Sequence, residues 1–291
     1  MMIREPVVAG QFYPANHAAC VRELEQLNAV DAPPMEAGEK PVAGLVPHAG
    51  WVCSGGVSAR VFKALASRRD PDVVVLFGGV HHYRGKPAAL FAHGRWDTPV
   101  GPMEVDDRLA ERILGHTNLI VEDPYAHENE HSIEVQVPML KFVYPKAKIV
   151  PLMIPITPKA DEMGDAVART LKAYDYNAVI VGTTDLTHYG PRYGFVPRGV
   201  GAEANDWAMR ENDARFVKLL CAMKAGELVA EAVSRMNACN SGAAAATVAA
   251  ARALGATKGV LLEQTSSSEV LMRKFNEPQE DSVGYAGIVF V

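Results

Sequence analysis

The stretch Val73-Val-Val-Leu-Phe77, followed by Gly78-Gly79-Val80-His81, predicts a β-strand that is buried on both faces and ends beside a histidine. Five consecutive apolar residues, most of them β-branched, are typical of a strand covered by helices on both sides. In open α/β sheets, loops beyond the carboxyl ends of parallel strands meet in one crevice. The stretch therefore predicts an α/β sheet with a candidate site at this edge.

The same pattern recurs along the chain. Similar apolar runs predict further strands at 42–46, 149–154, 178–181, 259–263 and 284–291. Helical periodicity predicts helices at 17–30, 57–67, 106–114, 160–173 and 203–223. This alternation is typical of a layered α/β/α fold with a mostly parallel or mixed central sheet.

The composition favours an ordinary globular protein with a small-molecule or peptide partner. Hydrophobic residues make up 48% and charged residues 22% of the 291, which argues against disorder and against a fibrous or membrane protein. Lys and Arg number 29 against 34 Asp and Glu, so the broad basic surface of a nucleic-acid binder is not expected. Without repeats or linkers, residues 1–291 are expected to form a single domain.

Targeting signals and cysteine usage favour a cytoplasmic protein. The amino terminus carries an acidic residue and a proline before any apolar run of signal-peptide length. The Ala-rich segment 243–251 is shorter than the about 20 apolar residues that a membrane span needs. The four cysteines show no Cys-x-x-Cys spacing, so we expect reduced thiols rather than a disulfide scaffold.

Two histidines lie just beyond predicted strands and are candidate metal ligands. His48 follows the strand at 42–46, and His81 follows the strand at 73–77. Neutral imidazole is the commonest metal ligand, although single loop histidines also occur without any such role. His82 points the opposite way in an extended chain, which favours a solvated or indirect role. Ser54-Gly55-Gly56, before the helix expected from residue 57, also suggests free N–H groups for an anion.

A cysteine is the third candidate ligand. Cys239 precedes a predicted Ala-rich helix, and a thiolate at a helix amino terminus has a lowered pKa. Cys53 lies close to His48 in sequence and is a rival thiol. Cys20 and Cys221 fall within amphipathic helical patterns and are interpreted as core residues.

The segment His127-Glu-Asn-Glu-His131 matches the His-Glu-x-x-His motif of zinc peptidases. That chemistry needs both histidines one turn apart on a helix. Here Ser132 resembles an N-cap, the apolar helical face begins after it, and Pro138 interrupts any helix extended backwards. We therefore predict no zinc-peptidase site, while Glu130 and His131 can still reach the metal site from a loop.

Asp185 and His188 form a candidate acid/base pair. They follow the strand at 178–181, and their spacing of three places both side chains on one face of a turn. A carboxylate that orients an imidazole makes a competent general acid/base. The alternative is that Asp185 is a helix N-cap and His188 only packs nearby. The loop at 191–201 is a candidate lid.

Four motifs together resemble the Memo-like family, also named AmmeMemoRadiSam system protein B. The resemblance extends from Pro6 to Val291. It is carried by Val8-Ala-Gly-Gln-Phe-Tyr-Pro14, Pro47-His-Ala-Gly-Trp51, Glu130-His-Ser-Ile-Glu-Val-Gln-Val-Pro138 and Asp185-Leu-Thr-His-Tyr-Gly190.

This resemblance implies a fold similar to that of class III extradiol dioxygenases, which hold non-haem Fe(II). It implies metal ligands at His48, His81 and Cys239, with Asp185 and His188 as further pocket residues. The chain departs from the family pattern at Gly79-Val80, where Pro-Asn is usual, and at Asn240-Ser241 after the cysteine. A thiolate in place of a carboxylate favours softer metals, including copper and zinc.

Two functions follow as hypotheses. The first is a metal-dependent oxidoreductase related to extradiol dioxygenases, with Fe(II) the favoured ion and an unknown substrate. The second is a non-catalytic metal- or ligand-binding protein that acts with the AMMECR1-like and radical SAM partners implied by the family name. A hydrolase is the third possibility.

Overall fold

A computed structural model describes residues 2–30, 35–36, 38–81 and 87–291. The predicted strand at 73–77 is present as β3 (Val73–Gly78) and lies inside a large mixed sheet. In the described part of the chain, this sheet has nine strands: β2 (Ala43–Val46), β3, β4 (Ala88–Leu90), β7 (Ile120–Glu122), β8 (Lys148–Met153), β9 (Ala178–Thr183), β10 (His188–Tyr189), β11 (Gly259–Ser266) and β12 (Ser282–Phe290).

The sheet is parallel at its centre and mixed at its edges. The strand order is β10-β12-β2-β9-β3-β8-β4-β7, and β11 also pairs with β12. Strands β2, β9, β3 and β8 run parallel, whereas β12 is antiparallel to β2 and β4 is antiparallel to β8. The predicted mixed α/β sheet is therefore confirmed. A separate small sheet joins β1 (Ile3–Arg4), β5 (Arg95–Trp96) and β6 (Met103–Glu104).

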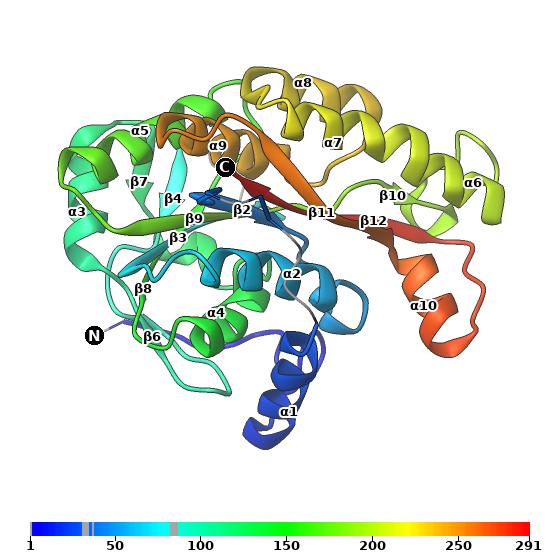
Figure 1. Ribbon diagram of the computed structural model, residues 1–291, viewed down its shortest axis with the longest axis horizontal. Coiled ribbons are helices and arrows are strands. Elements are labelled where there is room, and N and C mark those ends of the chain that lie inside the picture. Colours follow the sequence, from blue (N-terminus) through cyan, green and yellow to red (C-terminus); the bar gives the residue numbers. More distant parts are fainter. Residues whose placement is uncertain (1, 31–34, 37, 82–86) are drawn as a thin grey trace.

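Successive side chains of β3 enter two different hydrophobic cores. Val73, Val75 and Phe77 belong to one buried cluster, and Val74 and Leu76 belong to the other. This follows from the alternation of side chains along a strand. Helices cover both faces of the sheet (Figure 1), and every residue of β3 is buried. Polar residues therefore follow only after the strand ends.

Helices form a layer on each face of the sheet (Figure 1). The helix α9, whose first residues follow Cys239, packs against α5, α8 and three central strands, while α2 packs on the other face with α1 and α4. The helices are α1 (His17–Asn28), α2 (Trp51–Ala66), α3 (Asp107–His116), α4 (Val137–Val143), α5 (Ala160–Ala173), α6 (Ala202–Trp207), α7 (Ala214–Cys221), α8 (Ala225–Arg235), α9 (Ser241–Ala253) and α10 (Ser267–Phe275).

Close packing of small residues holds α9 against α5. A Cβ atom added at Gly164 of α5 would lie 2.0 Å from the carbonyl oxygen of Ala246 in α9. The side chains of 243–251 in α9 are buried. The Ala-rich segment is therefore a core helix, and it fixes the position of the loop that carries Cys239. No helix among the described residues has the length and hydropathy that a membrane crossing requires.

Two predicted helices differ from the structure by more than one or two residues at an end. Helix α2 begins at Trp51 rather than at residue 57, so Ser54, Gly55 and Gly56 lie within it. The N–H of Ser54 already donates to the carbonyl of Gly50 at 3.1 Å, so the suggested helix start with free N–H groups at 54–56 is wrong. The segment predicted as one helix at 203–223 comprises α6, the π-helical turn Ala208–Asp213 and α7.

Candidate metal centre

The sheet brings the predicted site residues to one edge. His48 follows β2, His81 follows β3, and Asp185 follows β9, and these three strands are neighbours in the order β2-β9-β3. Cys239 lies in the loop before α9, and its backbone N–H donates to the carbonyl of Asp185 at 3.1 Å. The convergence expected from the strand pattern is thus present.

Three imidazoles meet at this edge. One ring nitrogen from each of His48, His81 and His131 lies within 4.8 Å of those of the other two. The rings of His81 and His131 are stacked with centroids 4.5 Å apart, and His48 stands edge-on to both. The sequence placed His131 beside the site rather than among its ligands. These residues can hold a metal ion, because neutral imidazoles are common metal ligands.

Hydrogen bonds orient two of the rings. Nδ1 of His48 lies 2.7 Å from the hydroxyl of Thr183, and Nδ1 of His81 lies 2.9 Å from Oε1 of Glu130. When Nδ1 carries the proton in such a contact, Nε2 has a free lone pair for a metal ion. Thr183 was not identified from the sequence, although its place at the end of a predicted strand beside Asp185 is a usable signal.

Carboxylates and burial set the charge of the cluster. Burial lowers the pKa of His48 well below its usual value, and burial together with its two neighbouring histidines lowers the pKa of His131 to about 4. Burial also opposes protonation of His81, but the hydrogen bond and charge of Glu130 outweigh it and raise the pKa of His81. Burial would likewise raise the pKa of Glu130, yet His81 lowers it overall.

Cys239 lies next to His48. Its Sγ atom is 3.3 Å from Nε2 of His48 and accepts the backbone N–H of Asp185 at 3.3 Å. The expected lowering of the thiol pKa by the helix start is wrong, because burial and then the charge of Asp185 raise that pKa. Cys53 lies in α2 and packs against the buried cluster that contains Tyr285, whereas Cys20 is buried in α1 and Cys221 ends α7.

Asp185 and His188 do not form the predicted hydrogen bond. The segment between them forms no helical turn, because the N–H of Leu186 and the carbonyl of Thr187 bond Gly284 of β12, although the charge of His188 still acts on Asp185. Instead, Oδ1 of Asp185 accepts the backbone N–H of His48 at 2.7 Å, and Oδ2 lies 3.9 Å from Nε2 of the same histidine. Nδ1 of His188 lies 3.2 Å from the carbonyl of Leu186. Burial raises the pKa of Asp185.

His127 and His131 of the His-Glu-x-x-His match do not lie one turn apart on a helix, as predicted. His127 ends a 3₁₀ turn (Pro124–His127), is fully buried, and its Nε2 contacts the carbonyl of Ala89. Of the two histidines in the motif, His131 and not His127 belongs to the histidine cluster. Ser132 is not the predicted N-cap, because its hydroxyl bonds the backbone N–H and carbonyl of Gly79. His82 lies outside the described residues.

A cavity of about 390 Å³ opens over the cluster. His81, His188 and Cys239 face it, and Tyr193 from the predicted lid segment stands edge-on to His188 with ring centroids 5.0 Å apart. Its remaining described lining is mainly apolar: Ile156, Leu186, Ala232, Val233, Met236, Ala238 and Ser241. The site is therefore open to a small molecule.

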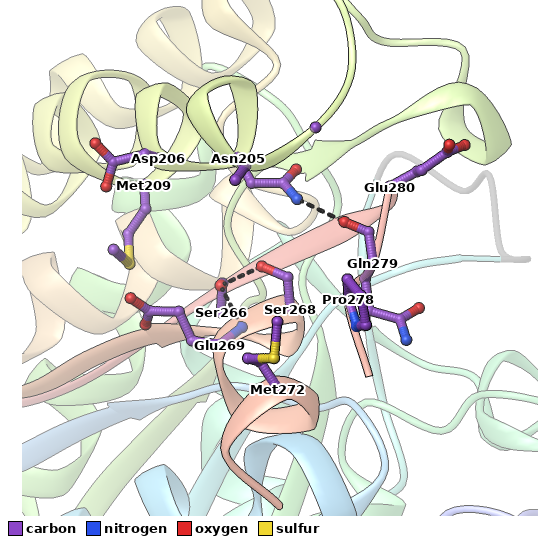
Figure 2. A pocket seen from close by; sticks show the side chains of 12 residues that line it. Asn205, Asp206, Met209, Ser266, Ser268, Glu269, Met272, Pro278, Gln279 and Glu280 are labelled. Carbon is purple, nitrogen blue, oxygen red and sulfur yellow. Dashed lines mark hydrogen bonds between the residues drawn. The ribbon is translucent and has the colours of Figure 1, made fainter. Parts of the chain in front are cut away.

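A second, larger pocket of about 550 Å³ lies away from the histidines, between α6 and α10 (Figure 2). It contains none of the predicted site residues. Ser266 and Ser268 bond each other at 2.9 Å, and Asn205 donates to the carbonyl of Gln279 at 3.0 Å (Figure 2). Among the described residues, the grouping of three metal-binding side chains lies at the histidines and not in this pocket.

Comparisons with known proteins match one family over nearly the whole chain. The family described as "Memo-like protein" matches residues 4–289. The "MEMO1 family protein" of Methanopyrus kandleri is 34% identical over 99% of both chains, and that of Pyrobaculum arsenaticum is 31% identical over 100% of this chain and 99% of the relative. A crystal structure of an uncharacterized protein, JW3007 from Escherichia coli K12, shares the fold with a TM-score of 0.57 and 13% identity, covering 87% of this chain and 100% of that one.

Proposed function

We propose, for a chain that belongs to the Memo-like family, that His48, His81 and His131 bind a divalent metal ion at the centre of an oxidoreductase site. The observation that carries this proposal is the convergence of three imidazole nitrogens within 4.8 Å of one another. Two of these rings are oriented from Nδ1 by a hydroxyl or a carboxylate, as metal-binding histidines generally are. Cys239 remains a predicted further ligand, since its Sγ atom adjoins Nε2 of His48.

We propose Fe(II) as the resident ion, with copper or zinc as alternatives. Imidazole suits all three metals, and a thiolate ligand would favour copper or zinc. The Memo-like family resemblance, which implies a fold similar to that of class III extradiol dioxygenases, favours iron. A bound Fe(II) ion would supply redox chemistry toward oxygen and an organic substrate.

The residues around the ion fit a site that binds and processes a small molecule. The cavity over His81 admits a ligand to the cluster, and its apolar walls exclude water from much of a bound molecule. His188 faces this cavity, so we propose that it exchanges a proton with the substrate. Asp185 holds the backbone of His48 and is proposed to position that ligand rather than His188.

Metal content and oxygen consumption test the proposal. Protein purified without oxygen is expected to contain about one divalent metal ion per chain, and His48→Ala and His81→Ala should lose it. The Fe(II)-loaded protein should consume oxygen with at least one member of a panel of catechols. Unchanged metal binding in both histidine variants would overturn the site.

The second function, that of a non-catalytic binding protein, applies if the protein binds metal without turnover. The site would then serve a binding protein that acts with AMMECR1-like and radical SAM partners, and these proteins belong in the same assay. Oxygen uptake that appears only with a partner would support an enzyme acting on a partner-borne substrate. Metal binding without oxygen uptake under any condition would favour the non-catalytic function.

A further inference from the structure

Asn240 lies beside the candidate metal site, although metal binding by the three histidines does not require an asparagine there. It directly follows Cys239, it is only 1% exposed, and its Nδ2 atom lies 3.4 Å from Nε2 of His48. Its Oδ1 atom is buried and has no hydrogen-bond partner among the described residues. A buried amide oxygen without a partner costs free energy, so its retention beside a candidate metal ligand needs an explanation.

Metal binding would change the contact between Asn240 and His48. When the ring proton of His48 is on Nδ1, Nε2 accepts the N–H of the Asn240 amide. A metal ion bound to Nε2 takes the lone pair that this N–H group needs. The amide N–H would then face a cation without an acceptor, which is unfavourable.

Rotation of the Asn240 side-chain amide removes this unfavourable contact and loses little hydrogen bonding. A half-turn of the amide exchanges Oδ1 and Nδ2, so that the oxygen lies roughly where Nδ2 is now. Only one long hydrogen bond of 3.4 Å is lost, because Oδ1 has no partner to give up among the described residues. Two ligand atoms bound to one ion at about 2.0–2.3 Å lie roughly 3.0–3.6 Å apart. The present 3.4 Å between the amide and Nε2 falls within that range.

Gly79 makes room for this amide. A Cβ atom added at residue 79 would lie 1.6 Å from both Cγ and Nδ2 of Asn240. Gly79 is not in the left-handed region of backbone conformation, so the need for glycine here comes from the contact with Asn240. Ser132 bonds both the N–H and the carbonyl of Gly79, which holds the backbone at this distance.

We propose that Asn240 is an additional ligand of the metal centre, that its Oδ1 turns toward the ion on binding, and that Gly79 is required to admit it. This inference rests on the proposed metal site. An amide oxygen is a hard, neutral ligand, and it would add an oxygen donor to the imidazoles without adding charge. Asparagine at position 240 therefore requires glycine at position 79.

Titration of the metal-free full-length protein with Co²⁺, without oxygen, tests this inference. Visible absorption reports the coordination of Co²⁺, and calorimetry gives its affinity. Asn240→Ala is expected to change the d–d bands and to weaken binding by about tenfold or more, at least the effect of removing an outer partner. Asn240→Asp keeps an oxygen at this position and should retain both binding and the wild-type coordination number.

Gly79→Ala provides a second test that leaves Asn240 in the sequence. Its methyl group should displace the amide and reproduce the spectral change of Asn240→Ala. The double variant should resemble Asn240→Ala with no additional loss, because both changes remove the same contact. If Asn240→Ala does not fold, as judged by circular dichroism, Gly79→Ala and Asn240→Asp decide the question.

Asn237 supplies the matched control. It is fully buried, its Oδ1 also lacks a partner among the described residues, and its Nδ2 donates to the carbonyl of Asn212 rather than to a histidine. Asn237→Ala should leave the Co²⁺ spectrum unchanged. Wild-type spectra and affinities in both Asn240→Ala and Gly79→Ala would overturn the proposed role of Asn240. They would leave the three-histidine site unaffected. A wild-type protein that binds no Co²⁺ would overturn the proposed metal site, and this inference with it.

Discussion

Glu130 holds His81 by two hydrogen bonds, one from the backbone N–H to Oε2 at 2.7 Å and one between ring Nδ1 and Oε1 at 2.9 Å. A third donor, the backbone N–H of Ser132, also reaches Oε1 at 2.9 Å. One buried carboxylate therefore fixes both the loop after β3 and the orientation of the imidazole. Such outer partners strengthen a metal–histidine bond because they fix the ring and raise its basicity.

Glu130→Gln should weaken metal binding about 10- to 100-fold, because the amide keeps the shape but loses the charge that supports His81. Calorimetry with Co²⁺ measures this change. Glu128→Gln is the matched control, since Glu128 is an exposed glutamate two residues away. Glu128→Gln should bind metal with wild-type affinity. Neither this variant nor the wild type should show peptidase activity. Equal affinities in the two variants would contradict the role of Glu130.

Separate substitutions distinguish the predicted ligands. His131→Ala should lower metal affinity at least tenfold if the three-histidine cluster binds the ion, since a ligand matters at least as much as an outer partner. Cys239→Ser should remove any thiolate-to-metal charge-transfer band from the near-ultraviolet spectrum of the Co²⁺-loaded protein. If His131→Ala retains full affinity while Cys239→Ser loses it, the ligand set is His48, His81 and Cys239.

The strand and helix pattern was the part of this structure that sequence could predict. Helix α5 has the predicted bounds, and β3 differs by one residue, because apolar runs and amphipathic periods are local signals. The early start of α2 was not predicted, since the intrinsic propensity of Gly55 and Gly56 opposes a helix. In the structure Gly55 packs against Leu27 of α1, so tertiary contact outweighs helix propensity.

The site was predictable where it depends on strand ends, and not where it depends on loop geometry. His48, His81 and Asp185 follow adjacent strands, so their convergence comes from sheet topology. The place of His131 among the imidazoles depends on how the loop before α4 folds back over the sheet edge. Likewise, the extended path from Asp185 to His188 could not be read from their spacing, which fits a turn equally well.

His188→Ala should retain the metal and lose turnover by about 10²- to 10⁴-fold, the usual contribution of a positioned acid or base. His188 faces the cavity and is not one of the three histidines whose ring nitrogens cluster. Metal stoichiometry and oxygen consumption, measured with a catechol that the wild type oxidises, check both parts. Loss of metal from this variant would contradict the prediction, since His188 would then be a ligand.

A buried carboxylate outside the metal centre should make stability depend on pH. Asp213, in the π-helical turn, is fully buried, and its Oδ1 accepts both the backbone N–H and the hydroxyl of Thr187. Its Oδ2 has no partner among the described residues and lies against Gly284. Burial raises the pKa of Asp213 to about 8 in spite of the bonds from Thr187.

Asp213→Asn should therefore gain stability relative to the wild type as pH rises from 5 to 8. An unfolded aspartate has a pKa of about 3.9, so between about pH 4 and 8 the folded protein holds a proton that the unfolded chain releases. This contribution to the free energy of unfolding falls with rising pH, by at most about 1.4 kcal/mol per pH unit. The amide introduced by the substitution keeps an acceptor for Thr187 and does not titrate. Urea unfolding at both pH values measures the difference, with the exposed Asp206→Asn as control. A difference between Asp213→Asn and wild type that is the same at pH 5 and pH 8 would show that Asp213 is ionised in the folded protein throughout this range.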